Sequence, residues 1–186
     1  MVEPLKLLLR TLVPLWAIAG VVETIQTIRT AQEENADQEQ MFSLVVFNGK
    51  RIATVYDRMP ITKVSDFNEK DYLPTNNTPL YDAMGDSITN LQRYIDEKDN
   101  ALVTIITDGY ENASMEWNHQ RVFHLVEDLK KKNWLFTYIG ANQDALAVAK
   151  GMGIDHSMNF TSSADGTKAM FMKEQRSRTA FYNKTT

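Results

Sequence analysis

The sequence lacks cysteine, so none of its 186 residues can form a disulfide bond or a thiolate ligand for zinc. An excess of basic residues is also lacking, because the formal net charge is −4. The charge therefore predicts no nucleic acid partner. Histidines are few and do not have the spacing of metal ligands (His119, His124 and His156). These absences are compatible with a protein of a reducing cytoplasm.

Long apolar runs are missing as well, because Leu12–Val22 is shorter than the ~20 residues that cross a bilayer. We therefore expect no membrane span. Lys6 and Arg10 precede this run, and Ala17-Ile18-Ala19 resembles a cleavage site, so export through a signal-like segment is an alternative. We favour a cytoplasmic protein, because cleavage after Ala19 would remove a strand that the predicted sheet needs at its centre.

What the sequence does contain is an alternation of strand and helix patterns, which predicts an α/β fold with a mostly parallel sheet. The predicted strands are Lys6–Val13, Phe42–Phe47, Arg51–Tyr56, Ala101–Thr107, Leu135–Ile139 and Met158–Phe160. The predicted helices are Val21–Gln32, Leu80–Ile95, Gln120–Lys132, Gln143–Lys150 and Gly166–Tyr182. Asn48-Gly49 predicts a hairpin that makes the third strand an antiparallel edge. At this length we expect one domain over residues 1–186.

Two polar residues mark one edge of the predicted sheet. Asp108 follows a buried strand, and Thr78 precedes a helix. Open α/β sheets bind ligands beyond the carboxyl ends of their strands. A hydroxyl and a carboxylate at this edge suit a hard cation such as Mg²⁺. The alternatives are an N-cap role for Thr78, with Pro79 at the first helical position, and a simple turn at Asp108-Gly109.

The strings Thr-Pro-Leu-Tyr-Asp-Ala, from Thr78, and Thr-Asp-Gly-Tyr-Glu-Asn-Ala-Ser, from Thr107, resemble the von Willebrand factor A (VWA) family. The resemblance covers roughly Val21 to Phe160 and is greatest to small stand-alone bacterial members. It implies a doubly wound, Rossmann-like sheet of about six strands in the order 3-2-1-4-5-6, with helices on both faces. It also implies a metal-ion-dependent adhesion site, in which Thr78 and Asp108 would be two of three parts. Such modules bind a partner protein through its acidic side chain.

The first part of that site, Asp-x-Ser-x-Ser, is absent, so we expect the chain to bind Mg²⁺ weakly or not at all. Arg10–Ala17 stands in its place. Codons for these residues can be chosen that read Asp-Leu-Ser-Ala-Ser-Met-Gly in another frame. The alternatives are a shifted reading frame and a natural divergent member that lost its metal site. In either case we expect residues 1–20 to form an aberrant first strand and loop, and residues 161–186 to form a C-terminal helix or tail.

If the segment is out of frame, it should fit the fold badly. We expect Lys6–Val13 to pair as a strand, and Pro14–Ala19 to form an irregular apolar patch over Thr78 and Asp108. Elsewhere, Asp82 is expected to offset the dipole of its helix. Ser114 is the expected cap of a helix that starts near Trp117.

The sequence shows no nucleophile–base pair, no paired catalytic carboxylates and no phosphate loop. We therefore expect a binding module and not an enzyme. The alternative is a Mg²⁺-dependent hydrolase of the phosphatase or nuclease type, for which Asp108 is the one clear carboxylate at a strand end. A degenerate domain that binds its partner without metal is a third possibility.

Overall fold

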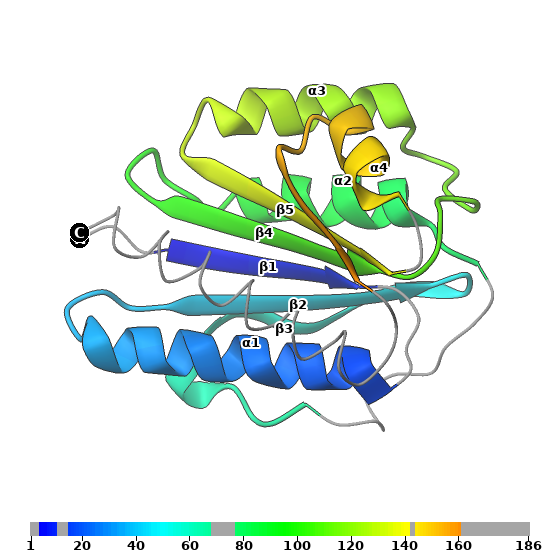
Figure 1. Cartoon of the computed structure of the whole chain (residues 1–186). Helices are drawn as coiled ribbons and strands as arrows, with labels where there is room; N and C mark the ends of the chain where they lie inside the picture. Colours follow the sequence, from blue (N-terminus) through cyan, green and yellow to red (C-terminus); the bar gives the residue numbers. More distant parts are fainter. Residues whose placement is uncertain (1–3, 11–14, 68–76, 142–143, 161–186) are drawn as a thin grey trace.

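A computed structural model describes residues 4–10, 15–67, 77–141 and 144–160 (Figure 1). Strands and helices alternate along these residues, as the sequence predicts. The elements are β1 (Pro4–Arg10), α1 (Leu15–Glu34), β2 (Met41–Asn48), β3 (Arg51–Pro60), the 3-10 helix η1 (Ile61–Lys63), α2 (Leu80–Gln92), β4 (Asn100–Thr107), α3 (His119–Lys130), β5 (Trp134–Ala141), α4 (Ala145–Gly151) and β6 (His156–Phe160).

The described strands form one sheet of six, in the order β3-β2-β1-β4-β5-β6. β1 pairs in parallel with β2 on one side and with β4 on the other, and β5 and β6 continue the parallel pairing. β3 alone is antiparallel, because the hairpin at Asn48-Gly49 returns the chain along β2. The predicted α/β class with a mostly parallel sheet is confirmed.

The helices cover both faces of the sheet, with α1 on one face and α2, α3 and α4 on the other (Figure 1). Alternate residues of the strands point to opposite faces, so each face has its own core. In β2, Leu44 and Val46 pack toward Val21 and Ile25 of α1. Val45 and Phe47 belong to the second core, together with residues of α2, α3 and α4. Each fully buried large apolar side chain contributes about 1.5–3 kcal/mol to folding.

The first helix is the main departure from the predicted elements. α1 begins at Leu15 and not at Val21, so Leu15–Ala19 is helical and the expected irregular segment is wrong there. The physical reason is that this stretch holds no glycine or proline, while leucine and alanine are strong helix formers. β1 extends from Pro4 to Arg10, and the remainder of the expected strand, residues 11–13, lies outside the described residues.

Several other boundaries differ from the prediction by a few residues. α2 ends at Gln92 and not at Ile95, because the chain turns before β4. β3 continues to Pro60. The helix predicted at Gly166–Tyr182 lies outside the described residues, as does the whole segment 161–186. Within the described ranges, no helix combines the length and the apolar character that crossing a membrane requires.

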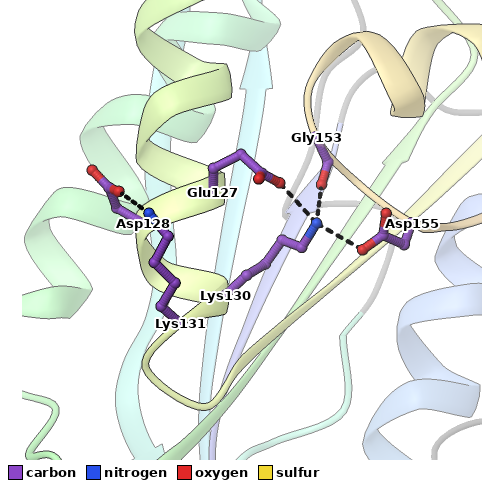
Figure 2. A network of polar contacts seen from close by, with 6 residues as sticks. All are labelled: Glu127, Asp128, Lys130, Lys131, Gly153 and Asp155. Carbon is purple, nitrogen blue, oxygen red and sulfur yellow. Dashed lines mark hydrogen bonds and ion pairs between the residues drawn. The ribbon is translucent and has the colours of Figure 1, made fainter.

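The end of α3 is attached to the segment that precedes β6 (Figure 2). Lys130 Nζ lies 2.8 Å from Glu127 Oε1, 2.9 Å from the carbonyl oxygen of Gly153 and 2.7 Å from Asp155 Oδ2. Lys131 instead pairs with Asp128 on its own helix at 2.9 Å. Lys130 therefore connects the end of α3 to the turn after α4.

Candidate ligand-binding edge of the sheet

Thr78 and Asp108 lie at the same edge of the sheet. Asp108 follows the last residue of β4 and is half-buried, whereas Thr78 is only 3% exposed. A Cβ atom placed on Gly109 would come within 2.6 Å of Thr78 Oγ1. The Thr78 hydroxyl therefore lies directly against the residue that follows Asp108. The folding of the chain brings together two segments that are 30 residues apart.

The Thr78 side chain does not cap α2. The helix begins at Leu80, its N-cap residue is Pro79, and no side chain at that position forms a capping hydrogen bond. The first N–H groups of a helix need acceptors from outside the helix. Here the acceptors come from the loop after β4: Tyr81 N donates to Glu111 Oε2 at 2.8 Å, and Asp82 N donates to Ser114 Oγ at 3.0 Å. The N-cap alternative for Thr78 is therefore wrong.

Asn112 holds the backbone of Thr78 from both sides. Its side-chain Oδ1 accepts the N–H of Thr78 at 2.8 Å, and its own N–H donates to the carbonyl oxygen of Thr78 at 3.2 Å. Both backbone groups of Thr78 are thus satisfied by one residue. The side chain of Thr78 is not needed for these bonds.

Glu111 organises the loop itself. Its Oε1 accepts N–H groups from Ala113 at 2.8 Å and from Ser114 at 2.7 Å. Its Oε2 accepts the hydroxyl of Ser114 at 2.7 Å, in addition to the N–H of Tyr81. This carboxylate is therefore saturated with hydrogen bonds.

Asp82 makes the reciprocal connection from α2 to the loop. Its buried carboxylate accepts the N–H groups of Met115 at 2.8 Å, Glu116 at 3.0 Å and Trp117 at 2.7 Å. Asp82 was expected only to offset the helix dipole, but its carboxylate also binds the loop to α2. Ser114 is not the cap of the next helix either: Asn118 caps α3 by accepting the N–H of Arg121 at 3.0 Å.

Two features of the sequence could have predicted this network. The tract Glu111-Asn112-Ala113-Ser114 has more hydrogen-bonding side chains than a simple turn needs, and α2 has proline where a capping side chain is expected. Neither feature predicts which groups pair in the hydrogen bonds.

Two large side chains of the same loop are exposed to solvent, Tyr110 at 57% and Met115 at 93%.

The fit of this edge to Mg²⁺ is partial. Threonine hydroxyl and aspartate carboxylate are the right ligand types, and Mg²⁺ keeps several waters when it binds few protein groups. The nearby carboxylates of Asp82 and Glu111 already accept several N–H groups each. Across the described part of the chain, no group of three or more His, Cys, Asp or Glu side chains could hold a metal ion. Residues 11–14, which follow β1 in the sequence, lie outside the described residues.

The phenol of Tyr81, at this edge, has a perturbed pKa. Burial, and secondly the negative charge of Glu111, raise the pKa of the Tyr81 phenol above its ordinary value. Both effects disfavour the charged phenolate. Tyr81 therefore stays neutral to higher pH than an exposed tyrosine.

No protein family and no curated protein matches the sequence. Solved structures match the fold. The VWA domain of SpRpn10 has a TM-score of 0.56 at 13% identity, over 90% of this chain and 92% of that domain.

Proximal thread matrix protein 1 from the mussel byssus also matches, in two structures. Their TM-scores are 0.53 and 0.52 at 14% identity, over 94% and 93% of this chain. The match covers 46% and 44% of the mussel protein, so this chain spans less than half its length. At such identities the similarity concerns the fold alone, and the chain has a VWA-like fold.

Proposed function

We propose that the chain is a protein-binding module, and that its partner binds the sheet edge formed by Thr78, Asp108 and the loop 109–117. The observation that supports this proposal is the hydrogen-bonded loop that follows Asp108, on which the side chains of Tyr110 and Met115 are exposed. Exposed aromatic and methionine side chains on a preorganised surface are typical of protein interfaces.

Under this proposal the edge takes an acidic side chain of the partner, and Thr78 and Asp108 are the residues that would hold a Mg²⁺ ion. When bound, the ion would supply the positive charge that attracts the partner's carboxylate. With few protein ligands, the chain as it stands should hold Mg²⁺ weakly or not at all, and contacts to Tyr110 and Met115 would then carry more of the affinity. We propose binding without a chemical reaction.

The proposal is tested by selecting peptides from a random displayed library on the immobilised chain, once with Mg²⁺ and once with EDTA. Variants D108A and Y110A should each weaken the binding of the selected peptides by about tenfold or more, because both contact groups lie at the edge. Peptides that need an ion should carry Asp or Glu and lose binding in EDTA.

A matched control is Y94A. Tyr94 is 54% exposed and lies between α2 and β4, at the opposite edge of the sheet from Tyr110. This variant should bind the peptides as the unmodified chain does. Peptides whose affinity falls with Y94A and stays constant with D108A and Y110A would place the binding surface elsewhere and contradict the proposal.

A further inference from the structure

The position of Thr78 at the sheet edge depends on two residues of the neighbouring loop. The segment before α2 contains Pro79 and no capping side chain, so it does not fix itself. Asn112 supplies both an acceptor and a donor to the backbone of Thr78. A pair of hydrogen bonds to one residue fixes both its distance and its orientation relative to the loop.

Gly109 supplies the space for the Thr78 side chain. The Cβ of any other residue would lie 2.6 Å from Thr78 Oγ1, much closer than atoms can approach without a shift. Thr78 is buried, so its hydroxyl has little room to move away. A side chain at position 109 would therefore displace the Thr78 hydroxyl, which lies against the residue that follows Asp108.

We propose that Asn112 and Gly109 are positioning residues of the candidate site: Asn112 holds the Thr78 backbone, and Gly109 lets the Thr78 hydroxyl lie beside Asp108. This inference rests on the proposed function for its consequence in binding. Its structural part stands on the hydrogen bonds and on the contact with Gly109. Neither residue is a ligand itself, and both act through Thr78.

The crossed hydrogen bonds between the loop and α2 explain why this arrangement holds. Glu111 and Ser114 accept N–H groups of α2, while Asp82 of α2 accepts N–H groups of the loop. Each segment provides hydrogen-bond acceptors for the N–H groups of the other, so the loop and the start of α2 are held together without the Asn112 side chain. Removal of the Asn112 side chain should thus take away the acceptor of the Thr78 N–H without unfolding the loop.

The experiment compares N112A, N112D and G109A with the unmodified chain. Amide hydrogen exchange of Thr78, measured by NMR, should become about tenfold faster in N112A, because the N–H loses its acceptor. N112D keeps an oxygen in the place of Oδ1, so it should restore slow exchange. In G109A the methyl resonance of Thr78 should shift, because the new Cβ displaces the side chain.

Binding of the selected peptides provides the second measurement. N112A and G109A should each weaken binding to the same extent as T78A, and neither should weaken it further when combined with T78A, because all three act on one group. Losses that add to that of T78A would overturn the proposal, as would unchanged exchange of the Thr78 amide in N112A. If no peptide binds, the proposed function fails, while the exchange and resonance data still decide the positioning roles.

Discussion

The indole ring of Trp117 occupies the space in which a side chain at position 85 would lie. A Cβ atom on Gly85 would come within 1.9 Å of Trp117 Cδ2, in the middle of α2. The indole N–H donates to Asp86 Oδ1 at 2.9 Å, and the guanidinium of Arg121 lies 4.3 Å from the ring centroid. The loop after β4 is therefore packed onto α2 through a ring that only glycine accommodates.

We predict that G85A destabilises the chain by about 1–3 kcal/mol, although alanine is the better helix former, because the ring must move. Urea denaturation measures the change. In a W117A background the same substitution should instead stabilise by about 1 kcal/mol, since the clash is gone. Equal effects of G85A in both backgrounds would show that the ring does not set the cost.

A second prediction concerns Thr89 in α2. Its Oγ1 is buried and has no hydrogen-bond partner among the residues that the structure describes. A buried hydroxyl without a partner costs free energy, so T89V, which keeps the shape, should raise the free energy of unfolding by about 1 kcal/mol.

The matched control for T89V is T24V. Thr24 is also helical and its side chain is buried, but its hydroxyl donates to the carbonyl oxygen of Gly20 at 2.7 Å. T24V should therefore lower the stability or leave it unchanged. The same urea titration serves both variants, and a gain in T24V equal to that in T89V would argue against the hydrogen-bond explanation.

A third prediction concerns alkaline pH. The pKa of Tyr81 is raised in the folded chain by burial and by Glu111, while in the unfolded chain it should be about 10. The folded state thus binds the phenolic proton more tightly. Its contribution to stability is complete below pH ~10 and is lost as the pH rises through the folded pKa.

The Y81F variant cannot ionise at this position, so its stability should fall less steeply than that of the unmodified chain above pH ~10. The free energy of unfolding, measured at several pH values between neutral and alkaline, gives the two curves. Curves that stay parallel above pH ~10 would mean that Tyr81 ionises alike in the folded and unfolded chain.

A fourth prediction concerns the segment after β1. Arg10 pairs with Ile106, two residues before Asp108, so position 10 lies at the carboxyl end of β1 beside the candidate site. Replacing Arg10 with Asp, and Thr11–Ala17 with Leu-Ser-Ala-Ser-Met-Gly, would restore the missing part of the adhesion site. We expect a higher midpoint of thermal unfolding and an affinity for Mg²⁺ greater by on the order of tenfold or more.

Calorimetry with Mg²⁺ or Mn²⁺, together with thermal denaturation, measures both effects. The control changes Arg10 to Asp alone, which adds a carboxylate without the serine hydroxyls and should bind metal more weakly than the full replacement. A full replacement that is no more stable and binds no more metal than the original chain would remove the physical support for a shifted reading frame.

Much of the fold could be predicted because it depends on local patterns. The β-branched run at Ala101–Thr107 is buried throughout, as its composition indicates. Asn48-Gly49 forms the hairpin, in which Asn48 Oδ1 accepts the N–H groups of Lys50 and Arg51. The start of α1 was predicted wrongly, because the expectation for Leu15–Ala19 came from the missing motif and not from the helix propensity of these residues.

The sequence by itself determined that strands and helices alternate, and that Thr78 and Asp108 belong to the edge beyond the carboxyl ends of the strands. Only the tertiary structure decided the partners of Asp82, Glu111 and Asn112. Their hydrogen bonds join segments about 30 residues apart, as between Tyr81 and Glu111. A short polar side chain can satisfy many backbone groups, and only packing of the two segments against each other selects among them.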